Sequence, residues 1–254
     1  LMGFNFQSAV TFLNQGPTEA TLPEVTFYNL IFWFIFPLIF PLITMRTFAD
    51  EYRMGTIETL STAPVNDWQI VLSKFFGGSA APLFFSPNAR AGGHSNRTRA
   101  PTVKFFGAVV FYIVLFLPSF LYFALFTWIS GGNAPLQSAG AYWSTYMLLL
   151  LLGMFFVSIG ILASSLVKDQ VNAAIISLAV ILLYLFIPSL LGLMLNSTDP
   201  RFTQVRGFLS PFDHMRDFAR GMVDTRQLVW YLSMTALLLV LTHQIFQSRK
   251  LKAA

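Results

Sequence analysis

Five long apolar runs dominate the pattern of hydrophobic and polar positions in this chain. They cover residues 27–45, 105–129, 142–167, 171–195 and 228–246, and none contains Asp, Glu, Lys or Arg. The hydrocarbon core of a bilayer is ~30 Å thick, so a spanning helix needs about 20 apolar residues, close to the length of each run. One such run would suit a buried helix of a soluble protein. Five of them predict an all-α, polytopic membrane helical bundle.

The start of the chain predicts a further, incomplete span. Residues 1–13 are partly apolar but too short to cross a bilayer, and they lack the basic region and cleavage site of a signal peptide. We interpret them as the outer remnant of a truncated first span. The expected architecture is five complete spans plus this remnant, in a parent protein with six spans and both termini in the cytoplasm.

The basic residues set the expected orientation. The formal net charge is +5, but the 16 Lys and Arg residues lie at span ends and in loops, not along one stripe suited to nucleic acid. Seven of them fall in residues 46–104 and three in the tail 247–254. By the positive-inside rule both segments face the cytoplasm, so the bilayer, and no nucleic acid, is the expected partner.

Residues 46–66 form the cytoplasmic segment with the pattern best suited to contact a partner. On a continuous helix, Glu51, Gly55, Glu58 and Thr62 would share one polar face. Gly55 would cost about 1 kcal/mol inside that helix, so it indicates a bend or a close backbone approach. Pro64, further on, ends the helix. An interfacial helix that merely joins two spans explains the pattern equally well.

Residues 78–103 have a different composition, rich in Gly, Pro, Ser, Asn and Arg, and show no helical or strand period. This composition predicts a disordered insertion. The sequence Lys-Phe-Phe-Gly flanks it on both sides, at residues 74–77 and 104–107. A basic loop that touches anionic lipid is the alternative, but the repeat favours a dispensable insertion.

Residues 198–227 are expected to be an extracytoplasmic loop that carries a short amphipathic helix, from about Ser210 to Arg220. A serine N-cap, a proline in the first helical position, an acidic first turn and a terminal glycine define its ends. The residues that carry this prediction are Ser210, Pro211, Phe212, Asp213, Arg220 and Gly221. The helix is expected either to cap the bundle or to gate an exit path.

Two faces are expected on this helix. Apolar side chains recur at three- and four-residue spacing, and charged ones cover the other side, where pairs at i, i+3 are worth about 0.2–0.5 kcal/mol each. The apolar face comprises Phe212, Met215, Phe218, Ala219 and Met222, and the charged face comprises Asp213, Arg216, Asp217 and Arg220.

No catalytic or metal-binding pattern is present in the sequence. The chain has no cysteine, and His94, His214 and His243 have no spacing suited to a metal site or a catalytic triad. No phosphate-binding loop of the Gly-x-x-x-x-Gly-Lys-Ser/Thr type occurs. We therefore expect no enzyme activity, no cofactor and no metal on this chain, and we interpret His243 as an interfacial residue.

Two motifs resemble a known family. Residues 43–65 (ITMRTFADEYRMGTIETLSTAPV), with 67–71 (DWQIV) and Lys74, are similar to the signature of ABC-2 type permeases. Residues 210–226 (SPFDHMRDFARGMVDTR) resemble the gliding-motility-associated branch of that family. The resemblance covers roughly residues 28–77 and 104–250, and the chain departs from it at the missing first span and the insertion.

The resemblance implies the membrane subunit of an exporter in the cytoplasmic (inner) membrane of a bacterium. ATP would be bound and hydrolysed by a separate cytoplasmic ABC ATPase, and a second permease copy or homologue would complete the transport path. Residues 46–66 would hold the helix that docks on the ATPase. The residues to which the resemblance gives a role in transmitting nucleotide-driven motion are Glu51, Gly55, Thr56, Glu58 and Pro64.

Two other classes of function compete with the exporter. An intramembrane enzyme needs ionisable residues at membrane depth, and the spans lack them. A secondary transporter or channel-like protein without an ATPase usually shows intramembrane charges or broken inverted repeats. The uncharged spans favour the exporter subunit, and the secondary transporter or channel is the alternative.

Overall fold

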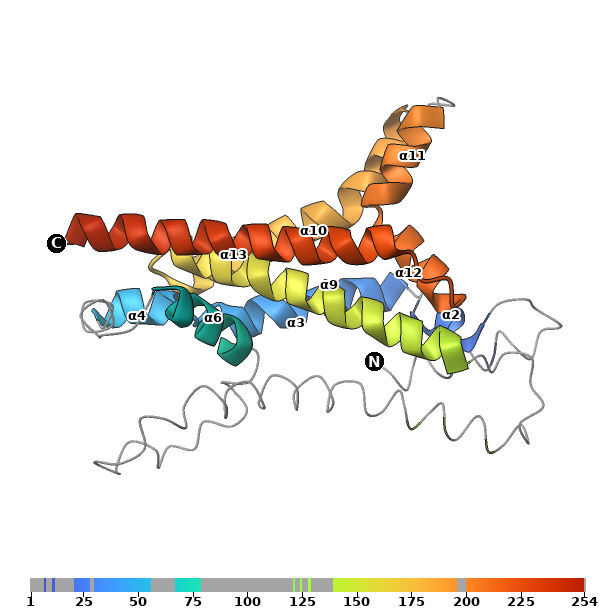
Figure 1. The fold of residues 1–254 in the computed structure, drawn as a ribbon, viewed down its shortest axis with the longest axis horizontal. Coiled ribbons are helices and arrows are strands. Elements are labelled where there is room, and N and C mark those ends of the chain that lie inside the picture. Colours follow the sequence, from blue (N-terminus) through green and yellow to red (C-terminus); the bar gives the residue numbers. More distant parts are fainter. Residues whose placement is uncertain are drawn as a thin grey trace. The chain divides into compact units, whose positions relative to one another are not determined.

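A computed structural model describes residues 21–27, 30–55, 67–78, 139–195 and 200–253, together with isolated residues 7, 11, 121, 124 and 128 (Figure 1). Every regular element in these residues is a helix, which confirms the predicted all-α fold class. The helices are α2 Leu22–Phe27, α3 Leu30–Thr44, α4 Ala49–Met54, α6 Asp67–Gly78, α9 Ala139–Leu166, α10 Gln170–Leu195, α11 Pro200–Leu209, α12 Pro211–Ala219 and α13 Thr225–Ala253.

Four of the described helical stretches are long and apolar enough to cross a membrane, namely Ile31–Met54, Gly140–Leu166, Gln170–Gly192 and Thr225–Arg249. They coincide with four of the five predicted runs and confirm a polytopic membrane protein. The fifth run, 105–129, lies outside the described residues apart from isolated positions. So do residues 56–66, residues 79–103 of the predicted insertion, and nearly all of residues 1–13.

The chain divides into two compact units, and each long helix contributes a part to both. We call the first the α12 unit, built from residues 1–37, 116–153 and 181–232. The second, the α4 unit, is built from residues 38–115, 154–180 and 233–254. Each unit has its own buried aromatic core, described in turn below.

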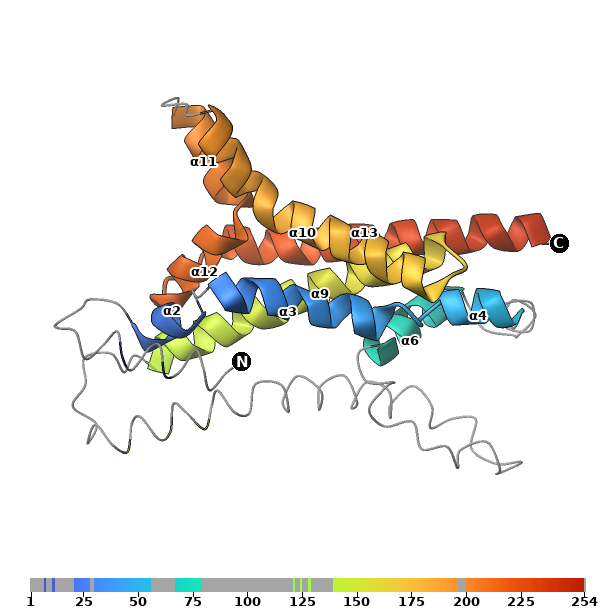
Figure 2. The same ribbon diagram turned by 180° about the vertical axis from the view of Figure 1, so that it is seen from behind.

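The core of the α12 unit gathers aromatic side chains around the start of α3. Phe27, Phe32 and Trp33 are fully buried, and the rings of Phe27 and Phe32 meet edge to face at 5.3 Å. Both views show α2 lying beside α12 (Figures 1 and 2). The Thr21 hydroxyl, just before α2, donates to the Ala219 carbonyl at the end of α12, at 2.6 Å. The short helix α2 is thereby fastened to α12.

The core of the α4 unit depends on a close approach between α3 and α9. Phe40 and Phe156 are buried, with ring centroids 5.4 Å apart. A Cβ placed on Gly160 of α9 would lie only 1.9 Å from Thr44 Oγ1 at the end of α3. No side chain fits in that space, so a glycine at this position permits the two helices to pack.

Candidate functional site at helix α4

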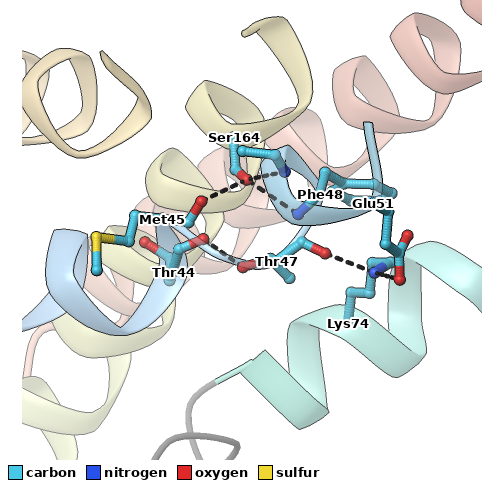
Figure 3. A network of polar contacts seen from close by, with 8 residues as sticks. Thr44, Met45, Thr47, Phe48, Glu51, Lys74 and Ser164 are labelled. Carbon is cyan, nitrogen blue, oxygen red and sulfur yellow. Dashed lines mark hydrogen bonds and ion pairs between the residues drawn. The ribbon is translucent and has the colours of Figure 1, made fainter. Parts of the chain in front are cut away.

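The start of α4 is held by a side chain from another helix. The hydroxyl of Ser164, on α9, accepts hydrogen bonds from the backbone N–H groups of Phe48 and Ala49, both at 3.0 Å, and donates to the Met45 carbonyl at 3.2 Å (Figure 3). Helix N-termini leave N–H groups without partners, and a serine hydroxyl commonly satisfies them. Ser164 therefore acts as the cap of α4, although it lies more than a hundred residues away in the chain.

A partly buried ion pair joins α4 to α6. Lys74 Nζ lies 2.6 Å from Glu51 Oε1, donates to the Thr47 carbonyl at 2.5 Å, and sits 4.6 Å from the centre of the Phe48 ring (Figure 3). The two side chains are 14% and 26% exposed, so solvent screens the pair less than it would a surface pair. Within the fold, the Glu51 carboxylate has Lys74 as its partner. A role of Glu51 in transmitting motion from an ATPase stays a prediction.

Further contacts join α4 to α10 and α13. The Gln170 amide, at the start of α10, donates to the Asp50 carboxylate. From α13, Phe246 packs on Phe48 with ring centroids 5.9 Å apart, and the Arg249 guanidinium lies 4.7 Å from the centre of the Tyr52 ring. The short helix is thus attached to α6, α9, α10 and α13. Displacing it would disturb all four helices.

The C-terminal end of α4 corrects the prediction of one continuous helix. The helix ends at Met54, and Gly55 adopts the left-handed conformation with φ +68° and donates its N–H to the Tyr52 carbonyl. Glycine takes this conformation without steric cost, so it stops the helix there. Gly55 is a helix terminator, not a residue of the helix interior, and Thr56, Glu58 and Pro64 lie outside the described residues.

In the other unit, α12 has the ends expected from the sequence. Ser210 is the N-cap and its hydroxyl accepts from the Asp213 N–H at 3.3 Å, with Pro211 as the first helical residue. The helix finishes at Ala219, Arg220 is its C-cap, and Gly221 has φ +82°. These signals are local in the sequence, which is why the pattern locates the helix correctly.

The predicted faces of α12 are only partly correct. Met215 and Phe218 are buried, but Met222 follows the helix end and is 56% exposed. The ion pairs described for Arg216 and Arg220 do not run along the helix but cross to Glu24 of α2, at 3.7 and 3.0 Å. Glu24 Oε1 thus lies within ion-pair distance of both arginines, and this contact depends on α2, which helical periodicity does not show.

His214 forms a buried polar cluster that sequence reasoning missed. Its ring is fully buried, and Nδ1 lies 2.9 Å from the Tyr231 hydroxyl of α13, which is 3.5 Å from the Tyr184 hydroxyl of α10. Burial lowers the pKa of the His214 imidazole below its ordinary value of 6.5, against smaller opposing effects of the Phe208 backbone and of nearby carboxylates. The cluster joins α12 to α10 and α13.

Two other expectations concern isolated groups. His243, interpreted as interfacial, stacks on Trp68 of α6 with ring centroids 4.3 Å apart. Within the described part of the chain, no three His, Asp or Glu side chains gather in a way that could hold a metal ion.

The four long apolar helices, with α4 attached at their ends, define a multi-pass membrane protein. A comparison with known protein families matches residues 3–251 to the ABC-2 family transporter proteins. The match covers nearly the whole chain, and the chain belongs to this family. Among curated proteins, no relative matches it. Membership of the family supports the role of an ABC permease, a membrane subunit of a transporter.

Proposed function

We propose that this chain is the membrane-spanning subunit of an ATP-driven exporter and that α4 receives the motion of a separate ABC ATPase. The observation that carries this proposal is the attachment of α4 to α6, α9, α10 and α13 through Lys74, Ser164, Gln170 and Arg249. A six-residue helix is marginal in water by itself, so these contacts, not its own hydrogen bonds, hold it in place.

The contacts make α4 a suitable receiver of motion. Its inner side is fixed by a hydroxyl cap, an ion pair, a carboxylate–amide bond and two aromatic contacts. Packed helices shift as bodies because protein interiors are close-packed. A push on α4 would therefore move the helix ends attached to it, and α9, α10 and α13 also contribute residues to the α12 unit.

Other parts of the proposal rest on the sequence pattern. The excess of basic residues in 46–104 and 247–254 supports a cytoplasmic position for α4 and for the end of α13, in the inner membrane of a bacterium. Thr56, Glu58 and Pro64, which follow α4 in the chain, would extend the ATPase-facing segment. A second permease copy would complete the path, and residues 210–226 favour the gliding-motility-associated branch.

Transmission of motion can be tested without knowledge of the substrate. The chain has no cysteine, so a single cysteine at the exposed Met222 can carry an environment-sensitive fluorophore. In nanodiscs with the ABC ATPase that the proposal predicts as the partner, ATP should change the emission of that fluorophore. The double substitution Glu51→Ala with Lys74→Ala should suppress that change by at least half while the ATPase still binds and hydrolyses ATP.

Lys168→Ala is the control for the loss of a cation, because Lys168 is exposed, lies in the turn between α9 and α10, and takes no part in the Glu51–Lys74 pair. It should leave the fluorescence response unchanged. An equal response in the control and in the double variant would remove α4 from the coupling route. Failure of the wild-type chain to bind the ATPase would contradict the proposed function itself.

A further inference from the structure

The contacts of α4 sort its side chains into an inner and an outer set. Ala49 is buried, Asp50 bonds to Gln170, Glu51 pairs with Lys74, and the Tyr52 ring lies against a guanidinium. All of these point to other helices of the same chain. The last two residues of the helix, Arg53 and Met54, are exposed, as is the terminating Gly55.

The exposed end of α4 consists of Arg53 and Met54, whose side chains add little to the packing of this chain. Within the described residues, Arg53 makes no ion pair or hydrogen bond through its guanidinium group. The Met54 side chain is 65% exposed and so gains little from burial. An arginine in the last turn interacts favourably with the helix dipole, which accounts for the charge of Arg53. The helix dipole does not account for the exposed Met54 beside it.

The position of this end excludes lipid tails as the natural cover. Helix α3 ends at Thr44, and α4 follows after the non-helical residues 45–48. The six residues of α4 include Asp50, Glu51 and Arg53. A charged side chain at the centre of a bilayer costs about 2.5–3.5 kcal/mol on insertion scales, so α4 belongs outside the hydrocarbon core, and Met54 lies in the headgroup region or the water beyond it. An apolar side chain there is available to a protein surface.

We propose that Arg53 and Met54 form the part of α4 that contacts the ATPase, and that the partner offers a carboxylate beside an apolar recess. The inference rests on the proposed function and names the chemistry of that contact. Arginine and methionine are enriched in protein interfaces, where glutamate is depleted, and arginine is frequent among the residues that dominate affinity. Methionine also adapts its shape to a recess. In this arrangement Asp50 and Glu51 hold α4 against the other helices of the chain. The surface that contacts the ATPase is formed by a cationic and an apolar side chain.

A binding measurement tests this assignment. The full chain, in nanodiscs of zwitterionic lipid, is immobilised and titrated with the purified ABC ATPase that the proposed function predicts as the partner. Arg53→Glu and Met54→Asp should each weaken binding about tenfold or more. Arg53→Gln, which avoids placing an acid at the helix end, should weaken it about threefold and flatten its salt dependence. Arg226→Glu, a matched charge reversal at an exposed position of the α12 unit, should change affinity less than twofold.

The outcomes separate this inference from the proposed function. If Arg53→Glu and Met54→Asp bind the ATPase as tightly as the wild type does, the assignment of these two residues is overturned. The proposed function, with an ATPase as partner, then still holds. If Arg53→Glu changes ATPase binding only when the nanodiscs contain anionic lipid, Arg53 is assigned to the membrane surface, and the inference is also overturned. A wild-type chain that does not bind the ATPase overturns both. Thermal unfolding of Arg53→Gln should match the wild type, and a shift would instead assign Arg53 to the stability of α4.

Discussion

Replacing the hydroxyl that caps α4 gives a direct measure of how firmly this helix is held. Ser164→Ala leaves the buried volume almost unchanged but removes the acceptor of two backbone N–H groups, each at 3.0 Å, and the donor to the Met45 carbonyl. Loss of an N-cap hydroxyl costs about 0.5–2 kcal/mol, and a buried N–H left without an acceptor costs about 1–3 kcal/mol. The two costs describe overlapping effects of one lost hydroxyl, so we expect the free energy of opening α4 to fall by about 1.5 kcal/mol.

Amide hydrogen exchange, followed by mass spectrometry in nanodiscs, measures that opening. The expected loss corresponds to roughly tenfold faster exchange in peptides that cover residues 48–54, with peptides from 139–153 unchanged. Ser165→Ala is the matched control, because the Ser165 hydroxyl is also buried but donates to the Leu162 carbonyl of its own helix, at 2.7 Å. Equal exchange in both variants and in the wild type would refute the assignment of Ser164 as the cap.

Three further predictions concern packing, pH dependence and topology. Gly160→Ala should lower the thermal unfolding midpoint or abolish folding, because its Cβ would collide with α3, whereas Gly140→Ala on the same helix meets nothing within 4 Å and should be tolerated. His214 has a lowered pKa in the folded state, so an opened state binds its proton more readily, and stability should decline as the pH falls below about 6.5. His214→Phe should weaken that decline in detergent unfolding curves, and an unchanged slope would exclude His214 as its cause. A cysteine at Ser248 should be labelled only from the cytoplasmic side and one at Met222 only from outside; the reverse result would invert the proposed orientation.

The parts of this fold that sequence predicts are those whose causes are local. The α12 helix begins at a Ser-Pro pair and ends at a glycine, and all of these residues lie within a dozen positions. The long apolar runs likewise depend only on length and the absence of charge. Four of them appear as helices, because a continuous apolar stretch in a membrane has few alternatives to a helix.

The contacts around α4 could not be predicted because their partners are distant in sequence. Glu51 pairs with a lysine 23 residues later, and Phe48 bonds to a serine 116 residues later. Helical periodicity assigns Glu51 to a polar face but does not say what that face meets. The nearest sequence signal was the small-residue pattern of Gly160 and Ser164 on α9, which indicates close packing but not a cap. The burial of His214 could not be predicted either, because its partner Tyr231 lies on another helix.

The distance between α4 and its cap also orders the biosynthesis of this protein. The residues of α4 leave the ribosome more than a hundred residues before Ser164, and a six-residue helix without a cap is unstable in water. The cap of α4 therefore becomes available only after α9 has been synthesised, and the contacts with Phe246 and Arg249 only after α13. A chain whose synthesis stops before α9 leaves the first N–H groups of α4 without the Ser164 hydroxyl.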